Sequence, residues 1–285
     1  MANAAFTHQR GEVFVDLELN GKRAIVTGST AGIGVGIAHS LAREGVRVAI
    51  NGRSERRGRA VVEEILAAGG DAVLALGDVA DDDGAKAAAT AALDGLGGVD
   101  IVVNNAGGFA GNSAVSSVFN IPPADWLRTF DMNAGAAVRM IQHFGPQMRD
   151  RGWGRLIQIA SGNAMMPSGE TPDYAASKAA MLNVSLGTAK ALANTGVTVN
   201  TISPGIIYTR SVKAWFRQIG EREGWGDDEA KSEAWVLKNY SPQMVSRIGR
   251  PADTGDAVTY LCSPRADFIN GIHWRVDGGA TPTIT

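Results

Sequence analysis

Cysteine is nearly absent from this sequence: its 285 residues contain one, Cys262. A single cysteine excludes an internal disulfide framework and a zinc site built from several cysteines. The four histidines are scattered and show no metal-ligand spacing. The sequence therefore predicts no metal site.

An excess of one charge and long apolar runs are missing as well. Lys and Arg total 27 against 29 Asp and Glu, a formal net charge of −2. A nucleic acid or an anionic membrane as the main partner would favour an excess of basic residues, so we expect neither. No stretch reaches the roughly 18 consecutive apolar residues of a membrane span, and residues 1–20 lack the pattern of a secretory signal. We predict a cytoplasmic, soluble protein in which residues 1–20 are an extension ahead of the core.

Short apolar, β-branched runs alternate with longer helical patterns from Gly21 onward. Strands are expected at 23–27, 46–51, 72–76, 99–104, 155–160, 197–203 and 272–276, and helices at 34–44, 55–68, 81–96, 124–149, 174–194 and 251–262. Runs that are apolar throughout, rather than alternating, indicate strands covered on both faces. The prediction for residues 21–285 is a single α/β domain of the Rossmann type, a doubly wound parallel sheet of about seven strands flanked by helices.

Residues 206–248 interrupt this alternation. They contain no strand pattern, hold three of the six Trp, and follow the sixth expected strand. Ligands of open α/β sheets bind beyond the carboxyl ends of the strands. A long insertion there predicts a helical lid over the substrate.

Glycine is the residue in excess, at 36 of 285 against a usual ~7%. Part of it lies in TGSTAGIG, residues 27–34, which connects the first strand to the first helix. Gly28 permits a tight turn, Gly32 lets the backbone approach a pyrophosphate, and Gly34 lets the helix pack closely on the sheet. The pattern predicts a dinucleotide site.

The end of the second strand indicates which dinucleotide. A free ribose 2′-hydroxyl is usually held by an acid at this point, whereas a 2′-phosphate needs a cation. Here Gly52 occupies the acidic position and Arg53 follows it, so NADP(H) is favoured and NAD(H) remains possible. The alternative is that Ser54 caps the next helix and the nearby arginines are solvated, which we expect for Arg57 and Arg59.

Chemistry is indicated by YAASK, which begins at Tyr174 and ends at Lys178. Positions i and i+4 of a helix share a face, so the phenol and the ammonium can point at one ligand. Ser161 ends the preceding strand.

With these motifs in this order, residues 21–279 resemble the short-chain dehydrogenase/reductase family, in particular its 3-oxoacyl-reductase-like, NADP-dependent members. The resemblance implies a catalytic tetrad of Asn133, Ser161, Tyr174 and Lys178, with Asn133 at a break in its helix. It implies cofactor contacts from Gly28, Ser29, Thr30, Gly32, Ile33, Gly34, Arg53, Asp78, Val79, Asn105, Ala106, Gly107, Tyr174, Lys178, Pro204, Gly205, Ile207 and Thr209. Members of the family are commonly homotetramers, with two helices and the last strand at the interfaces.

The family chemistry is hydride transfer between nicotinamide and a carbonyl or alcohol carbon. Tyr174 would act as general acid or base, and a nearby Lys178 cation is expected to lower a phenol pKa that is ordinarily near ~10. Ser161 would hold the substrate oxygen, and Asn133 would hold a water that links Lys178 to solvent.

Five side chains are candidate substrate contacts: Phe109, Met165, Met166, Tyr208 and Trp215. A surround of this kind suggests an apolar ketone, although the aromatic residues of the insertion could equally pack the lid itself. Two further functions remain open. One is an NAD-dependent alcohol dehydrogenase, and the other is a regulator that senses the nucleotide without catalysis.

Overall fold

The computed structural model describes residues 15–111 and 117–283, so most of the expected N-terminal extension lies outside the described residues. The part that is described packs on the body: Leu19 is buried in the core and Leu17 lies against it. Leu17 also accepts a hydrogen bond on its carbonyl from Ser263 Oγ. The core therefore begins a few residues before the first strand.

Seven parallel strands form one sheet in the order β3-β2-β1-β4-β5-β6-β7. The strands are β1 (Arg23–Val26), β2 (Arg47–Gly52), β3 (Asp71–Leu76), β4 (Ile101–Asn104), β5 (Gly154–Ile159), β6 (Val197–Pro204) and β7 (His273–Val276). The chain reverses its direction of winding between β1 and β4, which is where open α/β sheets bind ligands. The predicted fold class is confirmed.

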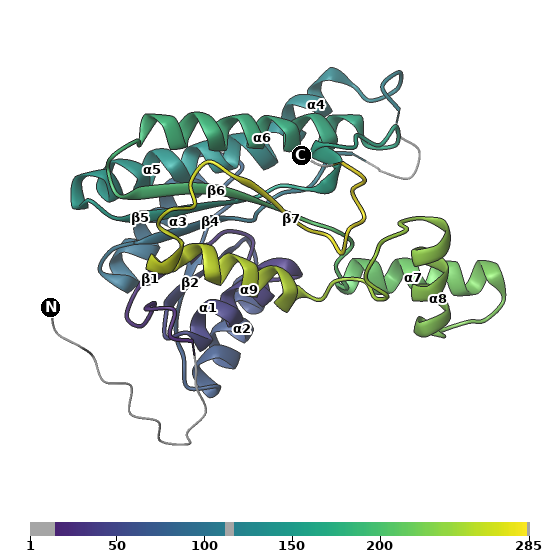
Figure 1. Ribbon diagram of the computed structural model, residues 1–285, viewed down its shortest axis with the longest axis horizontal. Helices are drawn as coiled ribbons and strands as arrows, with labels where there is room; N and C mark the ends of the chain where they lie inside the picture. Colours follow the sequence, from purple (N-terminus) through teal and green to yellow (C-terminus); the bar gives the residue numbers. More distant parts are fainter. Residues whose placement is uncertain (1–14, 112–116, 284–285) are drawn as a thin grey trace, which may run out of the picture.

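Helices cover both faces of the sheet (Figure 1). The helices are α1 (Ile33–Arg43), α2 (Glu55–Ala67), α3 (Asp82–Leu96), α4 (Pro123–Phe130), α5 (Ala136–Arg151), α6 (Pro172–Ala191), α7 (Arg210–Glu223), α8 (Glu229–Asn239) and α9 (Pro251–Cys262). Apolar side chains of α1, α2 and α9 pack on one face, and those of α3, α5 and α6 pack on the other. Neighbouring strand residues serve opposite layers, as Val26 and Ile25 do in β1, which explains why the strands are apolar throughout.

The helix expected over residues 124–149 is two helices, α4 and α5, joined by one π-helical turn, Asp131–Gly135. Asn133 is the middle residue of that turn and is fully buried. The expected break at Asn133 is present, and its form is a widened turn, a feature often found at functional sites.

Residues 206–248 form two helices, α7 and α8, that stand apart from the two layers (Figure 1). They have a small core of their own, built on Phe216, Ile219, Val236 and Ile248. A single-residue parallel bridge between Ile207 and Gly249 brings the two ends of this expected lid together.

No helix in the described part of the chain is both long and apolar enough to cross a membrane. Nor do three His, Cys, Asp or Glu side chains gather anywhere in residues 15–111 and 117–283 in a way that could hold a metal ion.

The packing of α1 against α9 accounts for two further glycines. A Cβ on Gly255 would lie 2.4 Å from Ser40 Oγ and 2.7 Å from the Gly36 carbonyl oxygen. Gly187 on α6 is exposed and has nothing within 4 Å of the same position. An added methyl group would therefore clash at position 255 and meet open space at position 187.

We predict that Gly255→Ala lowers the free energy of unfolding by about 1–3 kcal/mol, because the added methyl overpacks a closed helix interface. Gly187→Ala is the matched control and should be neutral or stabilising by up to about 1 kcal/mol, because alanine favours a helix over glycine. Urea denaturation of both variants measures the difference. Equal effects would show that the two helices do not pack this closely.

Candidate active site

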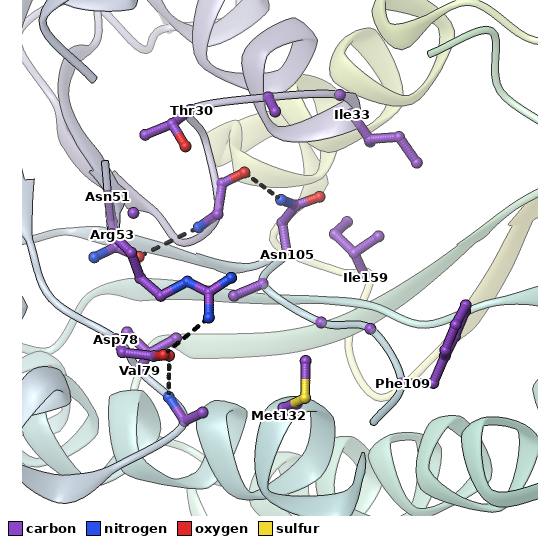
Figure 2. A pocket seen from close by; sticks show the side chains of 18 of the residues that line it. Thr30, Ile33, Asn51, Arg53, Asp78, Val79, Asn105, Phe109, Met132 and Ile159 are labelled. Atoms are coloured by element: carbon purple, nitrogen blue, oxygen red, sulfur yellow. Dashed lines mark hydrogen bonds and ion pairs between the residues drawn. The ribbon is translucent and has the colours of Figure 1, made fainter. Parts of the chain in front are cut away.

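A cavity of about 1160 Å³ runs along the carboxyl ends of β1 to β5. Its walls also include α6 and the beginning of α7. Figure 2 shows Arg53 and Asp78 together at one end and Phe109 at the other. This volume exceeds the usual range for a small ligand, so it can hold a long one together with a second molecule.

The glycine turn forms one wall of the cavity. Gly28 and Gly32 have φ of +65° and +64°, a conformation that favours glycine, and both line the cavity with Thr30 and Ile33. Gly32 is the N-cap of α1, and no side chain caps this helix end. The first amides of α1 are therefore available to an anion.

Two residues of the predicted turn lie behind the wall rather than on it. Ser29 is buried, and its hydroxyl donates to the Val26 carbonyl (2.7 Å) and accepts from the Asn51 amide (3.0 Å). A Cβ on Gly34 would lie 2.6 Å from both the Gly28 carbonyl oxygen and Asn105 Nδ2. Both residues support the turn by close packing, as predicted for Gly34 alone.

Asn51 is a support that the sequence analysis missed. Its Oδ1 accepts from the Gly28 amide (3.3 Å), and its Nδ2 donates to the carbonyls of Ala75 (2.8 Å) and Gly77 (3.2 Å). One buried amide thus joins the ends of three strands at the cavity. A polar residue at the end of an apolar strand was the available signal.

The nucleotide end holds Gly52, Arg53 and Asp78. Arg53 is exposed, and its guanidinium lies 3.4 Å from Asp78 Oδ2. A Cβ on Gly52 would lie 2.6 Å from Thr30 Cγ2. The site of the missing acid is therefore occupied by the side chain of Thr30.

Arg57 and Arg59, the other arginines considered in this segment, have different surroundings. Ser54 caps α2 by accepting from the Arg57 amide (3.4 Å), and Arg59 pairs with Glu55 (2.8 Å), both as expected of a solvated helix. Arg57 is exposed, as expected, and it also lines the cavity from the first turn of α2.

The segment after β4 closes against the glycine turn. The hydroxyl of Thr27 accepts from the amides of Asn105 (3.0 Å) and Ala106 (2.9 Å), and Asn105 Nδ2 donates to the Thr27 carbonyl (2.8 Å). Gly107 follows, where a Cβ would lie 2.4 Å from Asn133 Oδ1 and 3.1 Å from Lys178 Nζ. Gly107 therefore permits a close approach to two residues of the predicted tetrad.

The structure brings the tetrad together at the far end of the cavity. Tyr174 and Lys178 line it from α6, one turn apart, with Nζ 5.6 Å from the centre of the phenol ring. Lys178 is buried and donates to the Ile159 carbonyl (2.8 Å). The Ser161 hydroxyl accepts from the Asn163 amide (3.2 Å) and lies near enough to the phenol to lower its pKa.

The side chain of Asn133 hydrogen-bonds backbone groups next to the tetrad. Its Nδ2 donates to the carbonyls of Gly108 (2.6 Å) and Thr129 (2.7 Å), and its Oδ1 accepts from the Gly108 amide (3.2 Å). Asn133 thus fixes the segment that follows β4.

The predicted substrate contacts separate into two groups. Phe109 lines the cavity, and its ring meets that of Tyr174 edge-on with centroids 6.1 Å apart. Met165 and Met166 are not in the cavity wall, and Tyr208 and Trp215 pack around the core of the lid. The alternative that the lid aromatics pack the lid itself therefore holds for these two.

Tyr208 is further tied to α8 by a hydrogen bond from its hydroxyl to Glu229, which a sequence pattern does not reveal.

Only part of the sequence motif that follows β6 lines the cavity. Thr209 lines the cavity, joined by Arg210, Ser211 and Ala214 of α7, which the sequence analysis did not name. Pro204, Gly205 and Ile207 do not line it. They hold the start of the lid: Ile207 is buried, and a Cβ on Gly205 would lie 2.9 Å from Asp277 Cα.

Comparison with known proteins decides the family. A family model described as short chain dehydrogenase matches residues 22–220. The chain belongs to the short-chain dehydrogenase family. The expected family resemblance is confirmed.

Relatives of this short-chain dehydrogenase match it over nearly its whole length. YvaG of Bacillus subtilis, an uncharacterised oxidoreductase, is 36% identical over 270 residues, covering 94% of this chain and 99% of its own. The structure of L-sorbose reductase from Gluconobacter frateurii with NADPH and L-sorbose has a TM-score of 0.87 at 29% identity, covering 95% and 100%. A 7α-hydroxysteroid dehydrogenase complexed with NADH and 7-oxo glycochenodeoxycholic acid has a TM-score of 0.80 at 31% identity, covering 95% and 98%.

This short-chain dehydrogenase is therefore an oxidoreductase that acts on hydroxyl or carbonyl groups.

The electrostatics of the tetrad differ from the expectation. Burial raises the pKa of the Tyr174 phenol, and the hydrogen bond from Ser161 offsets this in part. Burial also lowers the pKa of Lys178, to about 7. The expected lowering of the Tyr174 pKa by Lys178 is wrong for this state, because desolvation disfavours the phenolate and leaves the lysine only partly charged at neutral pH.

The Lys178 pKa makes stability depend on pH. The unfolded chain, with a lysine pKa of 10.5, binds more protons than the folded chain between pH 7 and 10.5. The cost of the buried ammonium is therefore fully present below pH 7 and is relieved as the pH rises through this window.

We predict that wild type gains stability relative to Lys178→Met as the pH rises from 6.5 to 9, by at most about 1.4 kcal/mol per pH unit. Lys190→Met, at an exposed position of the same helix, is the control and should give a difference that does not vary with pH. Denaturant unfolding at several pH values measures both. Parallel curves for wild type and Lys178→Met would contradict the low pKa.

Proposed function

We propose that this chain is an NADP(H)-dependent oxidoreductase that interconverts a ketone and a secondary alcohol, with Tyr174 as the general acid or base. The observation that carries the proposal is the arrangement on α6, where Tyr174 and Lys178 line the cavity one turn apart, with Ser161 near enough to lower the pKa of the phenol. A proton donor within hydrogen-bond reach of a carbonyl oxygen is what ketone reduction requires.

The residues of the cavity fit a nicotinamide dinucleotide. Gly28 and Gly32 line one wall with positive φ and no side chain, so backbone faces the cavity at these two positions. The uncapped start of α1 offers amides to a pyrophosphate. When bound, the nicotinamide supplies or accepts the hydride.

The chain's own residues handle the proton. Ser161 and Tyr174 together bind the substrate oxygen, and Tyr174 gives it a proton in reduction or takes one in oxidation. Lys178, with a pKa of about 7, is charged for part of the population at neutral pH and in that form favours the phenolate. Asn133 holds Gly108 and lies beside the lysine at Gly107, where we propose that it holds the water that links Lys178 to solvent.

The preference for NADP(H) rests on the nucleotide end. Arg53 and Arg57 both line it, and Gly52 leaves no acid to bind a ribose 2′-hydroxyl. Asp78 favours the alternative of NAD(H), because its carboxylate pairs with Arg53 at 3.4 Å and would repel a 2′-phosphate. Solved relatives are described with either NADPH or NADH.

We propose an apolar ketone as substrate. The wall beside Tyr174 includes the Phe109 ring, and Ile159 and Met132 also line the cavity. Polar residues such as Asp131, Thr209 and Ser211 line other parts of it, so the apolar ring next to the phenol is what supports a carbonyl flanked by apolar carbon.

A homotetramer stays a prediction, as does a cytoplasmic location. The exposed side chains of Leu186 on α6 and Trp274 on β7 lie on the two elements where the family resemblance puts the interfaces.

Catalysis is tested by assaying a panel of ketones and alcohols with each cofactor, and turnover is measured from the nicotinamide absorbance. We predict that Tyr174→Phe lowers kcat by roughly 10²- to 10⁴-fold, because it removes the proton donor. NADPH binding, measured by fluorescence, should be retained. Tyr260→Phe, at a phenol that only packs edge-on against Trp274, is the control and should behave as wild type. Full turnover by Tyr174→Phe would refute the proposed mechanism.

A second experiment tests the cofactor. We predict that Arg53→Ala raises KM for NADPH by roughly ten- to a hundredfold and leaves KM for NADH unchanged, because a phosphate hydrogen bond to a charged group is worth about 1.5–3 kcal/mol. Arg59→Ala, on the same segment but paired with Glu55, should change neither. An equal effect on both cofactors would assign Arg53 to another role.

A further inference from the structure

Asp173, the residue before Tyr174, is a buried carboxylate that the proposed mechanism does not use. It is 3% exposed and lies in the first turn of α6. Its Oδ2 accepts a hydrogen bond from the hydroxyl of Thr129 (2.7 Å), which is fully buried in the last turn of α4. Burying a carboxylate is costly unless it is hydrogen-bonded, so this bond matters to both residues.

Thr129 continues the contact to the wall of the cavity. Its hydroxyl also accepts from the amide of Ala110 (3.0 Å). On the other side of Phe109, both backbone groups of Gly108 are held by Asn133. The two residues that flank Phe109 are therefore each fixed by a buried side chain.

Phe109 connects this series of contacts back to Tyr174. Its ring stands edge-on to that of Tyr174, with an interplanar angle of 87°. The contacts thus run from Tyr174 through the adjacent Asp173 to Thr129, Ala110 and Phe109, and back to the phenol. The distance between the phenol and the apolar wall depends on the two hydrogen bonds of Thr129.

We propose that Thr129 and Asp173 are positioning residues that hold Phe109 against Tyr174 and so set where the substrate carbonyl rests. The inference rests on the proposed function and adds a specificity-determining wall to it. Neither residue touches the reacting atoms. They act through the segment that carries Phe109.

The chemistry of the hydroxyl makes the proposal specific. Thr129 uses its one proton toward Asp173 and a lone pair toward Ala110. Serine can do both and valine can do neither, although valine has nearly the same shape as threonine. Val at this position would leave a buried acceptor and a buried donor without partners.

The test compares Thr129→Val with Thr129→Ser. We expect Thr129→Val to lower kcat/KM for the ketone by roughly tenfold or more, because the carbonyl is misplaced, and to leave the NADPH dissociation constant within about twofold. Thr129→Ser should restore wild-type values. Thr254→Val is the matched control, because Thr254 is also fully buried and its hydroxyl has no partner within the described residues. It should leave both quantities unchanged.

Hydrogen exchange gives a readout that does not depend on turnover. The peptide spanning residues 105–111 should exchange faster in Thr129→Val and at the wild-type rate in Thr129→Ser. An unchanged exchange rate in Thr129→Val would overturn the proposal that Thr129 holds this segment. Faster exchange with wild-type kcat/KM would overturn its effect on the substrate. If wild type turns over no ketone or alcohol, the proposed function fails, while hydrogen exchange still reports whether Thr129 holds the segment.

A second variant covers the case in which Thr129→Val does not fold. Phe109→Leu changes a partly exposed side chain at the end of the same path. We expect the same loss of kcat/KM from this single variant. Where Thr129→Val does fold, the losses of kcat/KM in the double variant should not add. Wild-type kcat/KM in Phe109→Leu would overturn the proposal.

Discussion

The close approach of backbone to backbone between the glycine turn and the segment after β4 is the constraint on which the site depends. Three hydrogen bonds, each made by the side chain of Thr27 or Asn105, join the two segments, and they form only because no further side chain separates them. A Cβ on Gly28 or Gly34 would occupy the space that the other segment fills. The same approach brings Gly107 against Asn133 and Lys178, so the nucleotide wall and the tetrad both depend on this contact between the two segments.

Much of the fold could be predicted because its signals are local. A strand covered on both faces must be apolar throughout, and a parallel sheet of such strands needs helices between them. The pair of Tyr174 and Lys178 was visible because helical spacing puts them on one face. The break at Asn133 came from the family resemblance, whereas its form as a π-helical turn came from the structure.

The remainder of the site depends on contacts between residues far apart in the sequence. Thr129 and Asp173 are separated by 44 positions, and Asn51 joins strands that a pattern treats one at a time. Met165, Met166, Tyr208 and Trp215 were expected at the substrate but are not among the residues that line the cavity, because residue type does not report the direction of a side chain. The pKa of Tyr174 was expected to fall because spacing showed a cation, while burial, which raises it, cannot be read from spacing.

The contact between Gly52 and Thr30 restricts the order in which this cofactor site can change. An acid at position 52 would need the space that Thr30 now fills, since even a Cβ there lies 2.6 Å from Thr30 Cγ2. The Thr30 side chain must therefore turn aside or be replaced by a smaller one before a side chain at position 52 can fit, and that change alone leaves the arginines in place. The residues at positions 30 and 52 thus depend on each other, so a charge cannot be introduced at the end of β2 without moving a residue of the glycine turn.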